Sequence, residues 1–485
     1  SWVSYRPHGI RKRPVMFTLP GILVITCLYA VSAYCAVGAA QTARTPQGAV
    51  GWVVFLLTLP VLALPAYLLL GQHRYHGYYI ARRESRRVKE SIASFGENTK
   101  PNTDKITMSL KPFEYCANLP ATCGNSARLL IDGDATFDAM FQAIDAAESY
   151  VLVQFYLIQD DVIGKALQKR MIDAAARGVS VLLLVDPIAS FSLPSRYLNE
   201  LSAAGVNVAE HQTKRRPWSR LKINFRNHRK TVVVDGNIGF TGGLNVGDQY
   251  LGNGATFPAW RDTHVEIRGP MVAQLQLIFA EDWHWQTGNL PIDSLSWSPQ
   301  HTQEDATGLI VATGPGDKSE TGSLMFFSAI AAAQNRFWIA SPYFVPDVDI
   351  IAALRHAALR GVDVRLLIPD VADHRIADLA AYGFLDEIRE AGVRVFRYTQ
   401  GFTHQKVFVV DDRLAAVGTT NLDNRSFRLN FEAMALFFDS EITSAIDEML
   451  RSDFSRSYEM TRTLDGQPPV IRYGAPLSRL FSPIL

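Results

Sequence analysis

Cysteine is scarce in this sequence, and neither sign of charge is in excess. The four cysteines among 485 residues do not stand at the spacing of a metal-binding cluster. We therefore expect no metal and no other cofactor. The formal net charge is +1, so the charge of the whole chain selects no nucleic acid and no other polyanionic partner.

Charge is missing altogether from two stretches near the N-terminus, residues 15–40 and 49–70. Each stretch is long enough to cross about 30 Å of hydrocarbon as a helix, and two in succession argue against a cleaved signal peptide. Basic residues flank the pair on both outer sides, with Arg6, Arg11, Lys12 and Arg13 before it and Arg74, Arg82, Arg83, Arg86, Arg87 and Lys89 after it. This distribution predicts a transmembrane helical hairpin with both ends in the cytoplasm.

The hairpin and its flanks form an anchor at residues 1–89, and residues 90–112 have the Gly, Asn, Pro and Ser content of a linker. Because the chain beyond this linker is expected in the cytoplasm, Cys116 and Cys123 are expected as free thiols, although they are close enough in sequence to pair.

From residue 113 onward, apolar runs typical of strands alternate with segments of helical spacing. Strands are expected at 150–158 and 179–185, with helices at 135–149 and 162–177. The same order returns later, with strands at 337–340 and 362–368 around a helix at 349–360. The pattern predicts an α/β fold, a mixed sheet flanked by helices, built as two similar halves with pseudo-two-fold symmetry at 113–300 and 301–485.

The strongest repeat is a motif that begins with His-x-Lys. His228 to Asn245 reads HRKTVVVDGNIGFTGGLN, and His404 to Asn421, 176 residues later, reads HQKVFVVDDRLAAVGTTN. The β-branched run closed by an aspartate is typical of a buried strand that enters a tight turn. A histidine and a lysine two residues apart share one face of an extended chain. Each copy can therefore direct an imidazole and an ammonium at one point.

Two histidines and two lysines suit the transfer of a phosphodiester group. One imidazole can attack phosphorus and form a phosphohistidine, while the other protonates the leaving alkoxide and then deprotonates the incoming hydroxyl. Lys230 and Lys406, with Asn245 and Asn421, would hold the non-bridging oxygens. Because both histidines must reach one phosphate, we expect the two copies to face each other.

These paired motifs resemble the signature of the phospholipase D superfamily. Within it, the whole chain is similar to the membrane-anchored bacterial cardiolipin synthases, through residues 260–264 (WRDTH), 341–346 (SPYFVP) and 421–426 (NLDNRS). The resemblance implies a phosphatidyltransferase of the bacterial inner membrane, with its catalytic halves on the cytoplasmic side. It implies that two phosphatidylglycerol molecules give cardiolipin and glycerol, with His228 as nucleophile and His404 as acid and base.

Four acidic residues are candidates for a supporting role. Asp235 and Asp411 complete the two motifs, but each lies seven residues beyond its histidine, so it faces away on an unbroken strand and is expected at a turn. Asp262 and Glu432 are better placed to fix the tautomers of the histidines. Asp262 follows His228, and Glu432 follows His404, so each is expected to serve its own half.

A basic, partly aromatic run at 214–230 precedes the first histidine and contains Arg215 and Arg220. It fits an entrance for anionic lipid headgroups, and Tyr343 and His374 are further candidates for headgroup contacts. The same composition would suit nucleic acid. We nevertheless expect no nucleic-acid partner, for two reasons. The basic residues do not extend beyond this region, and a protein that acts on nucleic acid does not need a membrane hairpin.

The residues alone leave the acceptor open. A phospholipase D that uses water, or a transferase that uses another alcohol, would need the same motifs. The expected partners are phosphatidylglycerol, cardiolipin and the lipid bilayer, and a homo-oligomer is compatible with the sequence.

Overall fold

A computed structural model describes residues 19–43, 45–71, 99–101, 106–186, 189–190, 192–209, 225–254, 256–257, 259–317 and 319–485. The chain forms two compact units, residues 1–74 and 75–485. The four cysteines are free thiols.

The N-terminal unit contains three apolar helices, α1 (Leu19–Thr42), α2 (Pro46–Thr58) and α3 (Pro60–Leu70). Only α1, with 24 residues, is long and apolar enough to cross a membrane among the described helices. The prediction of one continuous helix at 49–70 is wrong, because the helix breaks at Leu59. Leu59 leaves the helical conformation at φ −133° and ψ 59°, as expected for the residue before a proline.

The first half of the large unit begins with α6 (Lys111–Ala117) and alternates strands with helices, close to the predicted positions. Its helices are α7 (Asp132–Asp145), α8 (Val162–Ala176), α9 (Ser195–Ala203) and α10 (Met271–Thr287). Its strands are β1 (Thr122–Ile131), β2 (Tyr150–Phe155), β3 (Ser180–Val185), β4 (Asn207–Val208), β5 (Arg226–Asn227), β6 (Thr231–Val234), β7 (Ile238–Gly242), β8 (Trp260–Arg261) and β9 (Thr263–Arg268).

The second half repeats this order. Its helices are α11 (Thr321–Ala332), α12 (Val348–Leu359), α13 (Arg375–Glu390), α14 (Asn424–Arg428), α15 (Ser440–Ser455) and α16 (Pro469–Arg479). Its strands are β10 (Ala306–Thr313), β11 (Arg336–Ala340), β12 (Phe344–Val345), β13 (Asp363–Pro369), β14 (Arg394–Tyr398), β15 (Phe402–Thr403), β16 (Val407–Val410), β17 (Leu414–Gly418), β18 (Leu422–Asp423), β19 (Asn430–Phe437) and β20 (Ser457–Glu459).

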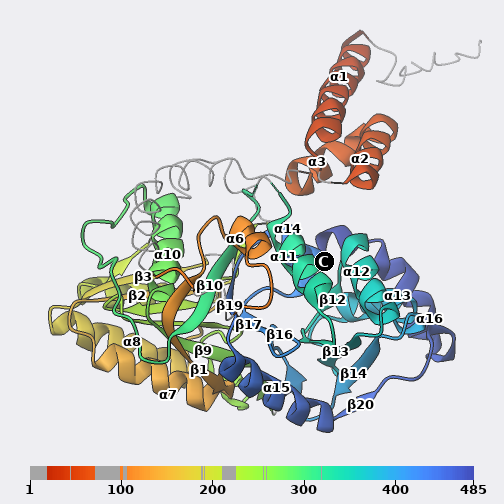
Figure 1. Ribbon diagram of the computed structural model, residues 1–485. Coiled ribbons are helices and arrows are strands. Elements are labelled where there is room, and N and C mark those ends of the chain that lie inside the picture. Colours follow the sequence, from red (N-terminus) through yellow and green to blue (C-terminus); the bar gives the residue numbers. More distant parts are fainter. Residues whose placement is uncertain are drawn as a thin grey trace, which may run out of the picture. The chain divides into compact units, whose positions relative to one another are not determined.

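One continuous sheet joins the two halves. Counted outward from the boundary between the halves, the strand order of the first half is β1-β9-β7-β6-β2-β3-β4. The strand order of the second half is β10-β19-β17-β16-β11-β13-β14, with β20 at the far edge. The two orders are equivalent strand by strand, and the antiparallel pair of β1 and β10 lies between them. The predicted pseudo-two-fold repeat is therefore confirmed, and Figure 1 shows its two halves side by side.

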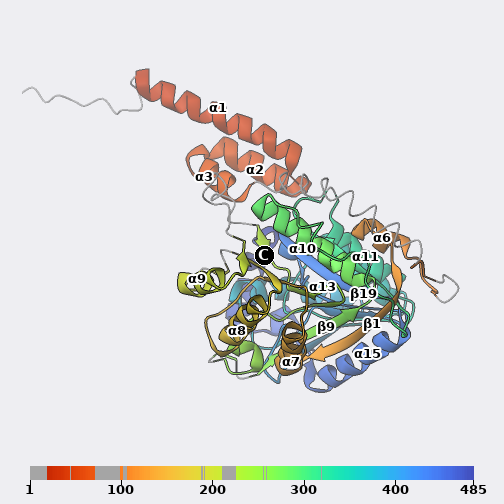
Figure 2. The ribbon, with the colours of Figure 1, turned by 90° about the vertical axis from the view of Figure 1, so that its left-hand side faces the viewer.

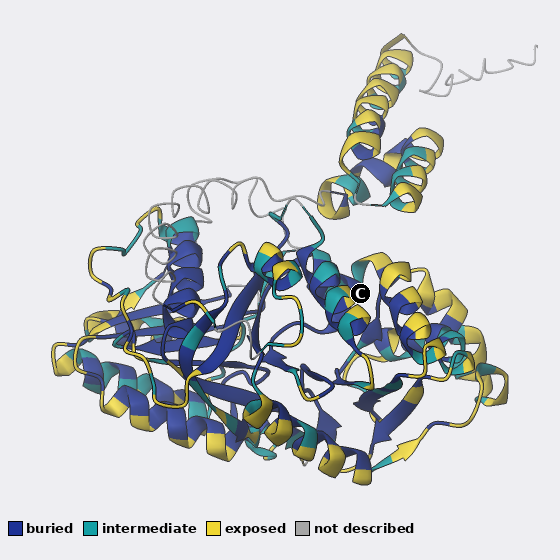
Figure 3. Cartoon of the chain, in the orientation of Figure 1, coloured by how far each residue is buried: buried dark blue, intermediate teal, exposed yellow. Residues whose placement is uncertain are grey.

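Helices cover both faces of this sheet. Figures 1 and 2 show α10 and α11 on one side and α7 and α15 on the other. The strands between them are buried almost throughout (Figure 3). One hydrophobic cluster contains residues from both halves, such as Val265 and Val417, and Phe113 of α6 packs into the cluster of the second half. The halves therefore share a core.

Two short pairs of parallel strands each join a strand of one half to a strand of the other half, and these two pairs determine the geometry of the site. β5 of the first half pairs with the start of β19, Asn227 opposite Phe431. β15 of the second half pairs with β8 of the first, Thr403 opposite Arg261. In each pair the next residue on one strand is a motif histidine, and the next on the other is an acid.

Candidate active site

The two His-x-Lys segments are buried just before the strands β6 and β16. His228 is 9% exposed and His404 is 7% exposed, while Lys230 and Lys406 are buried almost completely. The ammonium of Lys230 donates to the carbonyl oxygen of His228 at 2.7 Å, and that of Lys406 lies 2.8 Å from Nδ1 of His404. Each lysine therefore lies close to the histidine of its own motif.

Each histidine is bonded to the carboxylate of the opposite half. Nδ1 of His228 lies 3.0 Å from Oε2 of Glu432, and Nδ1 of His404 lies 2.8 Å from Oδ2 of Asp262. Our expectation that each acid serves its own half is wrong, because the crossed pairs β5–β19 and β8–β15 set His228 opposite Glu432 and His404 opposite Asp262. In both imidazoles, Nε2 is the nitrogen left for the substrate.

The two carboxylates are held differently. Glu432 accepts from the hydroxyl of Thr419 at 2.5 Å and from the amide of Asn430 at 3.1 Å. The equivalent of Thr419 in the first motif is Gly243, where an added Cβ would come within 2.0 Å of Asp262. Glycine at 243 thus makes room for Asp262, and threonine at 419 fixes the longer glutamate.

Burial and the two lysines set the electrostatics of the site. Burial lowers the pKa of His228, although Glu432 opposes this. Burial and the nearby ammonium groups of Lys406 and Lys230 bring the pKa of His404 well below its ordinary value. Burial would raise the pKa of Glu432, but His228 and Lys230 bring it below its ordinary value. The resting site therefore holds neutral imidazoles, with an ionised Glu432 beside His228.

Binding of a phosphate-like anion is expected to weaken as the pH rises. Burial lowers the pKa of Lys230 to about 7 and that of Lys406 to about 8, and a bound anion would raise both again. Binding of the anion is then coupled to the uptake of protons by the lysines. The affinity for the anion should therefore fall by up to roughly tenfold per pH unit for each lysine that must be reprotonated.

The inhibition constant of vanadate, measured from about pH 6.5 to about pH 9.5, tests this coupling. In the variant Lys230→Arg, the new side chain stays protonated over this whole pH range. The inhibition constant of this variant should therefore depend less steeply on pH. An inhibition constant that does not change with pH in the unmodified protein would contradict the expectation.

Asp235 and Asp411 bond to backbone amides at turns. The carboxylate of Asp235 accepts from the amides of Glu148, Ser149 and Tyr150. Asp411 accepts equivalently from those of Gln334, Asn335 and Arg336. Both aspartates have positive φ, 52° and 50°, which aspartate tolerates in tight turns.

The two motif asparagines are buried in different surroundings. Asn245 donates to the hydroxyl of Tyr250 at 3.2 Å and accepts from the amide of Leu157 at 3.3 Å. The side-chain oxygen of Asn421 is buried and has no hydrogen-bond partner in the described part of the chain. The two copies are therefore not equivalent as sites for phosphate oxygens.

The middle residue of each His-x-Lys fixes the segment to a helix of its own half. Arg229 donates to Asp282 on α10 at 2.6 Å and to the carbonyl of Glu432 at 3.0 Å. Gln405 donates to Asp453 on α15 at 2.9 Å. These residues were absent from our sequence-based candidates. Their only signal there was their position between the repeated histidine and lysine.

Tyr343 and His374, two candidates for headgroup contacts, lie close together. Their rings are 5.9 Å apart, and the hydroxyl of Tyr343 donates to Asp373 at 2.6 Å. Asp373 is close enough to His404 and Lys406 for its charge to act on the pKa of both. Arg215 and Arg220 lie outside the described residues.

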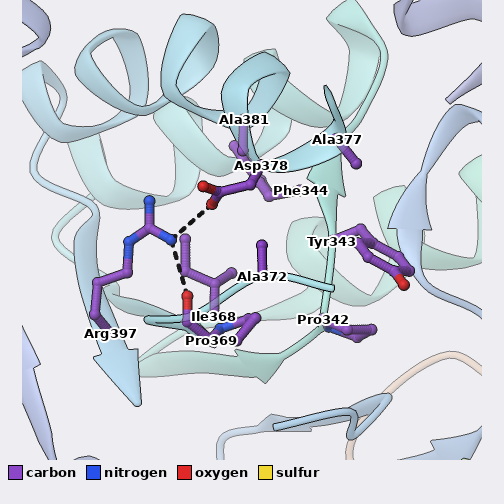
Figure 4. Close-up of a pocket in the computed structure, with 10 residues that line it drawn as sticks. All are labelled: Pro342, Tyr343, Phe344, Ile368, Pro369, Ala372, Ala377, Asp378, Ala381 and Arg397. Carbon is purple, nitrogen blue, oxygen red and sulfur yellow. Dashed lines mark hydrogen bonds and ion pairs between the residues drawn. The ribbon is translucent and has the colours of Figure 1, made fainter. Parts of the chain in front are cut away.

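A small pocket adjoins Tyr343 (Figure 4). Alanine, proline and other apolar side chains line most of it, and Arg397 pairs with Asp378 across one wall at 3.0 Å. The hydroxyl of Tyr343 points away from Arg397 (Figure 4). Neither His228 nor His404 lines this pocket, so it is separate from the paired histidines.

The doubled fold has a solved counterpart in the crystal structure of phosphatidylserine synthase from Haemophilus influenzae Rd KW20. The TM-score is 0.59 at 14% identity, over 77% of this chain and 99% of that one. A histidine–lysine pair in each half, each histidine bonded to an acid, gives this fold a site suited to phosphodiester chemistry.

Sequence relatives define the family more narrowly. The family described as "Cardiolipin synthase, PLD-like domain" matches residues 140–283 and 326–454. Cardiolipin synthase A of Pseudomonas aeruginosa LESB58 is 46% identical over 461 residues, 93% of each chain. Cardiolipin synthase A of Pseudomonas fluorescens Pf-5 is 44% identical over 95% of this chain and 98% of that protein. The chain belongs to the cardiolipin synthases of the phospholipase D superfamily and is a phosphatidyltransferase. Its apolar helix α1 fits association with a membrane.

Proposed function

We propose that this chain transfers a phosphatidyl group from one phosphatidylglycerol to another, giving cardiolipin and glycerol. The observation that carries the proposal is the crossed pair of histidines, each with Nδ1 bonded to a buried acid. Two imidazoles with fixed tautomers, beside two lysines, can serve both steps of a phosphodiester exchange.

In the first step, Nε2 of His228 attacks phosphorus as the bond to the glycerol oxygen breaks, and His404 protonates that oxygen. His404 gains the required proton because a bound phosphodiester anion raises its pKa from the low value of the empty site. Lys230 and Lys406 neutralise the non-bridging oxygens, with Asn245 and Asn421 as further donors. Tyr343, His374, Arg215 and Arg220 are proposed to contact the headgroups.

In the second step, His404 takes the proton from a hydroxyl of the second phosphatidylglycerol. The resulting oxygen attacks phosphorus, and the bond to His228 breaks. The ionised Glu432, held by Thr419 and Asn430, supports the assignment of His228 as nucleophile, since it stabilises the positive charge that develops on the attacking imidazole.

Purified protein incubated with phosphatidylglycerol should give cardiolipin and glycerol in equal amounts, identified by mass spectrometry. Phosphatidic acid without cardiolipin would instead define a hydrolase that uses water, and a product with an added alcohol would define a different acceptor. The variant with alanine at both His228 and His404 controls for a contaminating enzyme.

We also propose that the anchor is a hairpin of α1 with α2 and α3, in the bacterial inner membrane, with the catalytic unit on the cytoplasmic side. Basic residues before 15 and after 70 support this orientation. Since α2 has 13 residues and α3 has 11, neither reaches across about 30 Å by itself.

A cysteine placed at Gln47, in the first turn of α2, should react with an impermeant maleimide in intact spheroplasts. The background for this variant replaces Cys27, Cys35, Cys116 and Cys123 with serine. Labelling only after the membrane is permeabilised would contradict the orientation.

A further inference from the structure

Helix α16 presents its large apolar side chains outward. Val470, Tyr473, Leu477 and Leu480 recur three or four residues apart, and Phe481 follows Leu480 directly. These residues lie in α16 and the turn after it and are between 53% and 76% exposed. We call these five residues the outward stripe. The buried positions are the small residues Ala475, Ser478 and Ser482. A surface helix normally buries its apolar face, so here the pattern is inverted.

Contacts with α13 fix this orientation of α16. The guanidinium of Arg479 donates to the carbonyl of Gly383 at 2.9 Å and lies over the ring of Phe384 at 4.3 Å. At Gly474, an added Cβ would lie 3.5 Å from Leu379. Small residues thus allow the two helices to approach closely, and the outward stripe remains on the far side.

The outward stripe extends toward the mouth of the active site. The carbonyl oxygens of Ile484 and Leu485 accept from the guanidinium and the backbone amide of Arg425, which lies in α14. Phe481, the last residue of the outward stripe, precedes Ile484 by three residues. Helix α14 directly follows Asp423, whose charge acts on Lys406. The end of the outward stripe therefore lies toward the segment that follows Asn421.

We propose that the outward stripe rests in the surface of a phospholipid bilayer, as a second membrane contact besides the N-terminal helices. Residues 469–485 contain two arginines and no acid, so no carboxylate of this segment would oppose the phosphates of anionic lipids. Tyr473 and Phe481 are residue types that suit the boundary between headgroups and acyl chains. The contact would hold the mouth of the site at the lipid surface, and this consequence rests on the proposed function.

The contact is first tested without reference to activity. The full chain is reconstituted in vesicles of phosphatidylcholine and phosphatidylglycerol that contain a photoactivatable phosphatidylcholine. After irradiation, trypsin releases peptides 473–479 and 480–485, and mass spectrometry should find lipid on both. The matched control is peptide 356–360, which carries Leu359, 72% exposed on α12. Equal labelling of the control, or none on the α16 peptides, would overturn the proposal.

The second test compares substrates. Leu477→Asp together with Leu480→Asp should lower turnover of vesicle phosphatidylglycerol by about tenfold or more, with turnover of dissolved short-chain phosphatidylglycerol unchanged. Leu359→Asp should change neither. Equal turnover on vesicles by both variants would overturn the proposal, as would a change of oligomeric state caused by the α16 variant, because the outward stripe would then contact a second copy. If the unmodified protein acts on neither substrate, the proposed function fails, while the crosslinking result still decides the membrane contact.

Discussion

Replacing His404 with alanine should leave a phosphatidyl group attached to His228 when the donor carries p-nitrophenol in place of glycerol. This leaving group departs without protonation, so the first step no longer needs His404. The second step still requires a base for the incoming hydroxyl, and its loss should slow turnover roughly 10²–10⁴-fold. A burst of one p-nitrophenolate per chain, followed by slow turnover, would report the trapped intermediate.

The reciprocal variant tests the assignment of roles. His228→Ala should show no burst with the same donor, because the nucleophile is absent, and mass spectrometry should find no phosphatidyl adduct. For His404→Ala, the adduct should map to the tryptic peptide that contains His228. A burst in His228→Ala and none in His404→Ala would reverse the two roles.

Replacing Glu432 with glutamine should slow the burst of p-nitrophenolate that reports the first step, although Glu432 lies in the opposite half from His228. The carboxylate fixes the tautomer of His228 and stabilises the charge on its ring, so its loss should cost on the order of 10²–10⁴-fold in the rate of phosphoenzyme formation. Asp262→Asn should instead mainly slow the release of the phosphatidyl group to the acceptor, since Asp262 is bonded to His404.

A matched control for these variants is Glu266→Gln. Glu266 lies on β9, the strand that follows Asp262, and its carboxylate pairs with the surface residue Arg128. This change should leave both steps unaltered. If Asp262→Asn slowed the burst and Glu432→Gln did not, each acid would serve the histidine of its own half, and the crossed arrangement would have no role in the chemistry.

The sequence predicted the repeat and the fold class well, because both depend on local pattern. The apolar runs that became β2, β3, β11 and β13 are recognisable without any tertiary information. The expected continuous helix at 49–70 was wrong, since a proline within a uniformly apolar stretch can either kink a helix or end it, and Pro60 ends it.

The pairing of acids with histidines could not be predicted from spacing. Asp262 and Glu432 were identified as candidates, but the two strand pairs that assign them to their histidines, β5 with β19 and β8 with β15, each extend over only two residue pairs. So short a pairing leaves no periodic signal. The support of Glu432 by Thr419, with Gly243 in the equivalent position, likewise depends on how side chains pack in three dimensions.

The crossed bonds also constrain how such a chain can evolve. A repeat that arises by duplication is usually free to diverge in one copy while the other keeps its function. On the proposed mechanism, a mutation of the acid in one copy would disable the histidine of the other copy and leave the histidine of its own copy intact. Neither copy could then lose its acid or its histidine without loss of the transfer reaction.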